Sequence, residues 1–209
     1  MKSIKPVLAF VAVLAIALGF VLVTQQQPAQ AISATPSPAG LPEAPAFTLT
    51  DSNGVQHSLA DFKGKYVVLE WINDGCPFVV KFYEPGKMQE LQQTYTEQGV
   101  VWLAIASSKV GAQGHHDAAG WNQIIDDWGI NATAILLDAD GTVGRAYDAK
   151  TTPHMYVINP DGKLIYNGAI DSVRSTDSSD IASAENYVAK VLDAALLQNT
   201  KAYGCSVKY

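Results

Sequence analysis

Three runs of continuous apolar residues mark the middle of the chain. Residues 66–72 (YVVLEWI), 100–106 (VVWLAIA) and 132–138 (ATAILLD) consist mainly of β-branched, aromatic and aliphatic side chains that do not alternate with polar ones. Strands of this kind are buried on both faces of a sheet that helices cover. We therefore expect three central strands at these positions.

Segments of mixed polarity between these strands predict helices. The first is expected to begin at Cys76-Pro77 and to run to about Gln98, with a break at Pro85-Gly86, because proline cannot continue an α-helix. The later helices are expected over residues 121–128, 141–148 and 181–198.

Two hairpins complete the pattern. Residues 47–59 turn on Asn53-Gly54 and residues 153–170 turn on Asn159-Pro160-Asp161-Gly162, and both compositions favour a tight reversal of the chain. Strands that alternate with helices, followed by a hairpin and a last helix, predict an α/β fold. We expect a central mixed β-sheet with helices on both faces and an N-terminal β-hairpin.

The N-terminus carries an export signature. Lys2 and Lys5 precede an apolar run over residues 7–23, and Ala29-Gln30-Ala31 has the small-x-small pattern of a cleavage site. Residues 1–31 are therefore expected to be a signal peptide. Because the run approaches the ~20 residues of a membrane-spanning helix, an uncleaved membrane anchor is the alternative. In both cases the remaining chain is expected outside the cytoplasm, in the periplasm or secreted.

The rest of the chain divides into a linker, a domain and a tail. Residues 32–45 are rich in proline and alanine and are expected to form an extended tether. Residues 46–198 are expected to fold as one domain, and residues 199–209 form a C-terminal tail that carries Cys205.

The charge balance argues against one class of partner. The chain has 14 Lys and Arg against 20 Asp and Glu, a net charge of −6, so it lacks the basic surface of a nucleic-acid-binding protein. His115-His116-Asp117 has no further ligands at metal-binding spacing. His154 is considered as a proton partner of a reactive group or as a copper ligand, but we expect neither a metal ion nor another cofactor.

The candidate chemistry centres on Cys76, which follows the first buried strand in EWINDGCPF. Pro77 suits the first position of a helix, so Cys76 becomes the N-cap and faces free N–H groups and the positive end of the helix dipole. This environment favours the thiolate, which is the nucleophilic form of cysteine. The prediction requires a sulfur that is not sealed in the core, and an inert core cysteine is the alternative.

The segment PAFTLTDSNGVQHSLADFKGKYVVLEWINDGCPF, followed downstream by TTPHMYVINPDGKLIYNGAI, resembles the redoxins. Over residues 43–198 the chain is similar to the peroxiredoxin-like branch of the alkyl hydroperoxide reductase and thiol-specific antioxidant family. The resemblance implies a thioredoxin-like fold, a reactive Cys76 and a cis peptide bond before Pro153, for which a trans-proline is the alternative. The candidate substrate-binding residues around this site are Thr152, Pro153, Trp71, Pro77 and Phe78.

The chain departs from the family pattern at three positions. Val79 stands where thioredoxins have their second cysteine, Asn73 where peroxiredoxins have a threonine, and Pro153 where they have an arginine. The missing groups would orient a peroxide and stabilise its leaving oxygen. The substrate is therefore left open between a peroxide and a protein or small-molecule disulfide, with Asn73 as a candidate catalytic residue.

Glu70 is the one charge inside the strand YVVLEWI. It lies six residues before Cys76, where the resemblance to thioredoxins implies a buried acid that relays protons, and a raised pKa would suit that role. The alternative is a carboxylate that points out of the sheet toward Lys63 or Lys65.

Cys205, in AYGCSVKY, is the only other cysteine. Three roles are open for it. In the first, Cys205 lies on a mobile tail and resolves an oxidised Cys76. In the second, it forms a permanent disulfide with Cys76. In the third, it stays free or forms a disulfide with another protein.

Together these features predict an exported thiol oxidoreductase with Cys76 as nucleophile, resolved by Cys205 or by an external thiol reductant. Lys81 and Tyr83, farther along the same helix, are expected to line the cleft or to lie on a solvated face. The rival from another class is a non-catalytic binding module in which Cys76 and Cys205 form a fixed disulfide.

Overall fold

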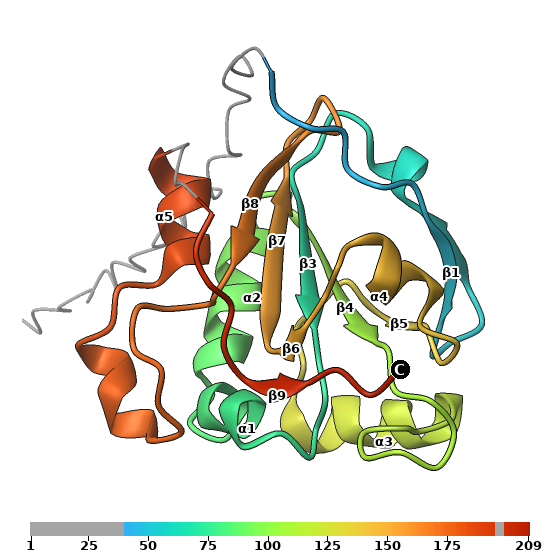
Figure 1. Ribbon diagram of the computed structural model, residues 1–209, viewed down its shortest axis with the longest axis vertical. Helices are drawn as coiled ribbons and strands as arrows, with labels where there is room; N and C mark the ends of the chain where they lie inside the picture. Colours follow the sequence, from blue (N-terminus) through green and yellow to red (C-terminus); the bar gives the residue numbers. More distant parts are fainter. Residues whose placement is uncertain (1–39, 195–198) are drawn as a thin grey trace, which may run out of the picture.

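The computed structural model describes residues 40–194 and 199–209, and its centre is a seven-stranded mixed β-sheet (Figure 1). The strands are Thr48–Asp51 (β1), Gln56–Ser58 (β2), Val67–Trp71 (β3), Val101–Ala106 (β4), Ala134–Leu137 (β5), His154–Ile158 (β7) and Leu164–Gly168 (β8). Their spatial order is β2-β1-β5-β4-β3-β7-β8. β3 pairs in parallel with β4 and antiparallel with β7, so it lies well inside the sheet.

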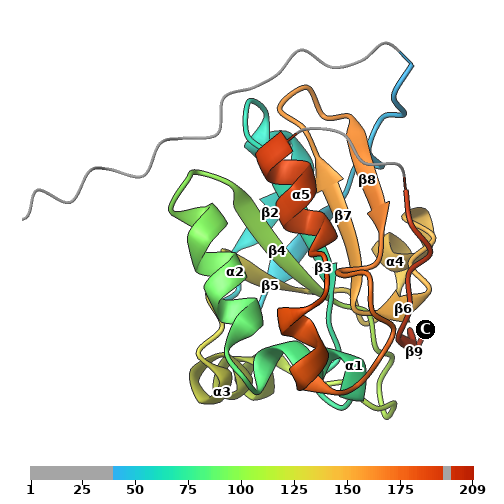
Figure 2. The same ribbon diagram turned by 90° about the vertical axis from the view of Figure 1, so that its left-hand side faces the viewer.

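Helices cover both faces of this sheet. Figure 2 shows α2 (Lys87–Thr96) and α5 (Tyr187–Ala194) on one side and α4 (Thr142–Ala146) on the other. α1 (Pro77–Tyr83) and α3 (Ala118–Trp128) pack into the same hydrophobic layer as α2 and α5. α4 packs with the opposite faces of the strands in a second layer, against which the 3-10 helix η1 (Leu59–Phe62) also packs through Leu59 and Phe62.

Alternation along the strands assigns each side chain to one of these two layers. In β3, Val68 lies in the layer under α1 and α2, whereas Val67, Leu69 and Trp71 lie in the layer under α4. All of β3 is buried, which explains why its sequence shows no polar alternation. The predicted central strands, both hairpins and the break between α1 and α2 are confirmed.

The last helix begins later than the sequence predicts. α5 starts at Tyr187, and a short 3-10 helix, η2 (Ser178–Ala182), occupies the position where we expect its start. Asn186 explains the late start, because its side chain accepts a hydrogen bond from the Ala189 N–H, as a helix N-cap does. The predicted end of this helix lies outside the described residues.

The C-terminal segment is attached to the domain. β9 (Cys205–Ser206) pairs antiparallel with β6 (Thr151–Thr152) in a two-stranded sheet beside α1 (Figure 1). The expectation of a mobile tail is therefore wrong for the part that carries Cys205, because backbone hydrogen bonds fix it.

The expected signal peptide or anchor, residues 1–31, lies outside the described residues, as does the linker up to residue 39. Within the described ranges no helix combines the length and the apolar character needed to cross a bilayer. Contacts with the domain begin before residue 46. The Pro42 carbonyl accepts a hydrogen bond from the Leu164 N–H at 2.9 Å, and the Ala44 N–H donates one to the Gly162 carbonyl at 3.0 Å.

Candidate active site around Cys76

The turn between β3 and α1 is held by Asn73. Its carbonyl accepts a hydrogen bond from the Cys76 N–H at 3.0 Å, and its side-chain oxygen accepts one from the Gly75 N–H at 3.0 Å. Its side-chain amide donates to the Gln113 carbonyl at 3.1 Å. Asn73 is buried, so its amide positions the turn that carries Cys76, and direct participation in the chemistry stays a prediction.

Cys76 is the N-cap of α1, as the sequence predicts. Its backbone is extended (φ −89°, ψ 118°), and Pro77 occupies the first turn of the helix. The Cys76 thiol donates a hydrogen bond to the Thr152 carbonyl at 3.0 Å, and the Thr152-Pro153 peptide bond is cis. The predicted cis bond and the nearness of Thr152 to the sulfur are thus observed, while contact of these residues with substrate stays a prediction.

Cys205 lies against Cys76. Cys205 is the register partner of Thr152 in the β6–β9 pair, and its thiol hydrogen-bonds with the Cys76 sulfur. Both cysteines are free thiols. Gly204 permits this approach, because a Cβ at this position would lie 2.0 Å from the Thr152 carbonyl oxygen. A larger residue at position 204 would therefore displace β9 from β6.

The two thiols differ in acidity. Burial favours the neutral form of Cys76, but hydrogen bonds to its sulfur, led by that from the Cys205 thiol, outweigh burial and lower the pKa of Cys76. Burial, together with the neighbouring Cys76 sulfur, raises the pKa of Cys205 to about 11. Cys76 is therefore the first of the pair to ionise.

The segment that carries Cys205 packs against the core cluster that contains Cys76. Cys76 is 0% exposed, whereas Cys205 in β9 is half-buried. The expectation of an open sulfur at the mouth of the helix is thus corrected, because the C-terminal segment folds back over it. At neutral pH the raised pKa of Cys205 leaves less of that thiol ionised, so Cys205 is the weaker nucleophile of the pair.

Glu70 is enclosed by hydrogen-bond donors from three elements. Its carboxylate accepts hydrogen bonds from the Tyr83 hydroxyl at 2.8 Å, the Trp102 indole N–H at 2.8 Å and the Gln92 amide at 3.1 Å. Burial outweighs these three hydrogen bonds and raises the pKa of Glu70 to about 7. The carboxyl group can therefore gain or lose a proton near neutral pH.

The position of Glu70 excludes one of the two alternatives that the sequence leaves open. The carboxylate is fully buried, so the orientation toward Lys63 or Lys65 is wrong. Its partner Tyr83 belongs to α1, the helix that Cys76 caps, and lies in the same core layer as Cys76. Glu70 thus lies beneath the helix that carries the sulfur.

Two sequence candidates belong to the other core layer. Trp71 is 0% exposed, and its indole N–H donates to the Ser107 hydroxyl at 3.0 Å. Trp71 thus packs in the core layer under α4, opposite the layer that contains Cys76, and its contact with a substrate stays a prediction. His154 hydrogen-bonds with the Asn167 side chain at 2.7 Å, and burial lowers the pKa of His154 to about 4. It is neutral at pH 7, its other ring nitrogen contacts the Lys150 N–H and the Tyr156 hydroxyl, and its role as a proton partner of Cys76 stays a prediction.

Pro77 and Phe78 lie at the start of α1. Pro77 is exposed and Phe78 is half-buried, with its ring edge-on to Tyr203 at a centroid distance of 5.7 Å. Both stay candidates for contact with a substrate. In the part of the chain that the structure describes, no three His, Cys, Asp or Glu side chains are grouped so as to hold a metal ion.

Sequence reasoning missed the burial of Lys81 and Tyr83. Neither lies on a solvated face, because both are almost fully buried, and Tyr83 lines a pocket that α1 shares with Trp128 of α3. A signal was present in PFVVKFY, the sequence of α1. A helix that is apolar on all sides is a buried helix, so its one lysine is expected to be buried with a partner.

Comparison with known protein families matches residues 42–167, more than half of the chain, to the AhpC/TSA family. The thiol-disulfide oxidoreductase ResA of Bacillus subtilis is 28% identical over 130 residues, which cover 59% of this chain and 63% of that protein. The match thus spans less than two thirds of that relative. The ResA protein of Geobacillus kaustophilus is 28% identical over 159 residues, 75% of this chain and 81% of its own.

Solved structures agree on the fold. An uncharacterized conserved protein from Geobacillus kaustophilus superposes with a TM-score of 0.68 at 26% identity, covering 81% of this chain and 91% of its own. The thioredoxin domain of a thiol-disulfide oxidoreductase from Bacteroides vulgatus superposes with a TM-score of 0.50 at 23% identity, covering 70% of this chain and 97% of its own. The fold is thioredoxin-like, and the chain belongs to the AhpC/TSA family.

Proposed function

We propose that the protein is a thiol–disulfide oxidoreductase in which Cys76 and Cys205 alternate between two thiols and one disulfide. The observation that carries this proposal is the contact of the Cys205 thiol with Cys76, whose pKa is lowered. The ResA relatives, which are named as thiol-disulfide oxidoreductases, support it. The proposed substrate is a protein or small-molecule disulfide.

The proposed cycle has two exchange steps. The Cys76 thiolate attacks one sulfur of the substrate disulfide, the substrate S–S bond breaks, and the other substrate sulfur leaves as a thiolate. Cys205 then loses its proton and attacks the Cys76 sulfur of the mixed disulfide, which releases the substrate as a dithiol. The substrate gains two electrons, and an external thiol reductant restores the Cys76–Cys205 disulfide to two thiols.

Glu70 is the proposed proton acceptor and donor of this cycle. Each exchange step removes a proton from one thiol and delivers one to a leaving thiolate. A carboxyl group with a pKa of about 7, bound to Tyr83 of α1, suits both directions of transfer near neutral pH.

The reduction potential of the cysteine pair tests this proposal. We expect the midpoint potential of the Cys76–Cys205 disulfide in glutathione buffers to lie above about −300 mV, because a redox-active pair must accept electrons from such thiols. Mass spectrometry after acid quenching and alkylation measures the fraction oxidised. A potential below about −300 mV would show a fixed disulfide and support the non-catalytic binding module instead.

Peroxide reduction is the second candidate, and membership of the AhpC/TSA family is the observation that favours it. The geometry argues against efficient peroxide chemistry. The Asn73 amide is engaged by the turn, and the chain has Pro153 where the family resemblance implies an arginine. Reduction of a peroxide is accelerated mainly by hydrogen-bond donors that are already oriented toward the oxygen that leaves, and Asn73 and Pro153 do not supply such donors.

Export is proposed from the N-terminal sequence. We expect residues 1–31 to direct the chain out of the cytoplasm and into an oxidising compartment, in which Cys76 and Cys205 can form a disulfide. Cell fractionation with intact-mass measurement checks this expectation. An intact mass that corresponds to a chain starting at Ile32 shows cleavage. A full-length chain in the membrane fraction shows that residues 7–23 are retained as an anchor. Recovery of the protein in the cytoplasmic fraction contradicts export.

A further inference from the structure

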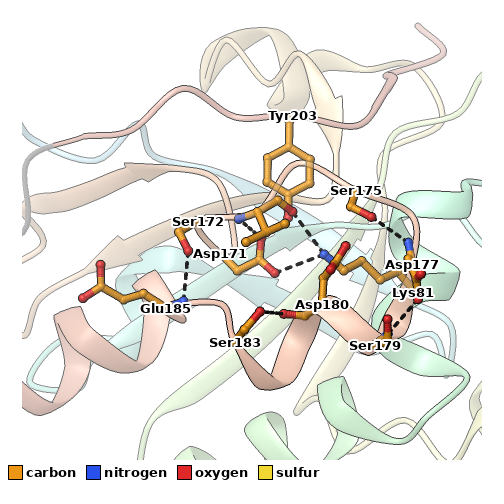
Figure 3. Close-up of polar contacts among 11 residues, drawn as sticks. Lys81, Asp171, Ser172, Ser175, Asp177, Ser179, Asp180, Ser183, Glu185 and Tyr203 are labelled. Carbon is orange, nitrogen blue, oxygen red and sulfur yellow. Dashed lines mark hydrogen bonds and ion pairs between the residues drawn. The ribbon is translucent and has the colours of Figure 1, made fainter.

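Asp171 lies where three segments of the chain meet (Figure 3). It forms a β-bridge with Asn186 that joins the two ends of the loop after β8. Its Oδ2 atom accepts a hydrogen bond from Lys81 Nζ of α1 at 3.2 Å. Its Oδ1 atom accepts one from the Tyr203 hydroxyl of the C-terminal segment. One carboxylate thus contacts α1 and the C-terminal segment at the same time.

These three side chains are buried. Lys81 is 2% exposed, Asp171 3% and Tyr203 7%. Val173 adds two hydrogen bonds to this network, because its carbonyl accepts from Lys81 Nζ at 3.1 Å and its N–H donates to Asp171 Oδ1 at 3.1 Å. A buried ion pair with further hydrogen bonds holds its members in one geometry, since any other arrangement would leave a charge without a partner.

The two ends of this network lie close in sequence to the two cysteines. Lys81 is one turn past Cys76 in α1, and Tyr203 precedes Cys205 by two residues. The Tyr203 ring also packs edge-on against Phe78 in the first turn of α1. Both cysteine-bearing segments are therefore attached to the same carboxylate.

We propose that Lys81, Asp171 and Tyr203 form a clasp that positions Cys205 against Cys76 and thereby favours the disulfide between them. This inference rests on the proposed function. Holding two reacting groups together raises their effective concentration, which strengthens an intramolecular bond without any new contact at the sulfur atoms. These three are positioning residues, because their hydrogen bonds go to one another and to Val173 and not to either sulfur.

The variant Tyr203→Phe isolates the clasp. It removes one hydroxyl and keeps the aromatic ring as well as the Lys81–Asp171 ion pair, whereas a single change at Lys81 or Asp171 would leave a buried charge unpaired. Tyr95→Phe is the matched control. The Tyr95 hydroxyl donates to the Asp193 carboxylate at 2.9 Å, between α2 and α5. The control thus loses a similar hydrogen bond away from both cysteines.

The first measurement is the equilibrium of the full chain with glutathione. Cys76 and Cys205 together give up two electrons and two protons and form a disulfide, while oxidised glutathione takes up these electrons and protons and becomes two glutathione thiols. We expect Tyr203→Phe to lower this equilibrium constant about tenfold, which raises the reduction potential by about 30 mV. The equilibrium constant of Tyr95→Phe should stay within about twofold of the wild-type value. The melting temperatures of the two variants should change by a similar amount.

The second measurement is the rate at which iodoacetamide alkylates Cys76 in the reduced protein. β9 covers Cys76, so Tyr203→Phe should accelerate alkylation several-fold and Tyr95→Phe should not. The clasp is overturned if the two variants agree in both measurements. If the wild-type protein forms no Cys76–Cys205 disulfide, the proposed function fails, and the alkylation rates alone then decide whether the clasp holds Cys205 over Cys76.

Discussion

Replacement of Cys76 by serine is expected to reduce disulfide-exchange activity by at least about a thousandfold, to the rate of the external thiol alone. The serine hydroxyl can keep the hydrogen bond to the Thr152 carbonyl, so the fold is retained. It is not ionised at neutral pH and cannot attack a sulfur atom as a thiolate does. Reduction of insulin by a dithiol, followed by turbidity, measures the loss.

Cys205→Ser is the matched control, because it removes the other thiol of the pair. Attack by Cys76 continues in this variant, but the cycle stops at the mixed disulfide, which mass spectrometry detects as a substrate adduct on Cys76. The opposite pattern, in which Cys205→Ser abolishes the first attack and Cys76→Ser only stalls resolution, would assign the nucleophile to Cys205.

The same proteins separate disulfide exchange from peroxide reduction. In Cys205→Ser, hydrogen peroxide would convert Cys76 to a sulfenic acid that no second thiol can resolve, and dimedone traps this species. We expect this trapping to be slow, at the rate of an ordinary thiolate, because Asn73 is engaged by the turn. Trapping much faster than the first attack on a disulfide would make the protein a peroxidase.

Glu70→Gln is expected to change how the stability of the fold depends on pH. Burial raises the pKa of Glu70 from 4.5 to about 7, so the folded state holds its proton to a higher pH than the unfolded state does. The stabilisation is complete below pH 4.5 and is lost as pH rises through 7. Relative to Glu70→Gln, the wild-type protein should therefore lose about 3 kcal/mol of unfolding free energy across this range.

Urea denaturation at several pH values measures this difference. Other groups that titrate in the same range, such as His154, are common to both proteins and cancel in the comparison. Glu90→Gln is the control, because it removes an exposed carboxylate of α2 that pairs with Lys87. It should change stability by less than about 0.5 kcal/mol at every pH. Parallel curves for wild type and Glu70→Gln would contradict the raised pKa of Glu70.

Local features of the site could be predicted from the sequence. Cys76 caps α1 because Pro77 begins the helix, and the break before α2 follows from Pro85-Gly86. These features depend on residues within one turn of each other, so their causes lie within a few positions of the chain. The cis bond before Pro153 is different, because it was implied by the resemblance to the redoxins and not by local composition.

Burial in a strand without alternation could be predicted, but the face of each side chain could not. All five residues of β3 are buried, so a polar-apolar pattern does not distinguish its two faces. The sequence places Trp71 at the substrate, but Trp71 lies in the opposite layer, whereas Glu70 faces the layer that contains Cys76. The helices that cover each face decide these positions.

The sequence by itself determined the α/β class, the central strands and a cysteine at the start of a helix, because periodicity, capping and turn composition are local. Only the tertiary structure decided that Cys205 pairs with Thr152 and covers Cys76, that three donors surround Glu70, and that Lys81 is buried with Asp171. Those contacts join segments far apart in the chain, and the packing of elements and the register of strands bring them together.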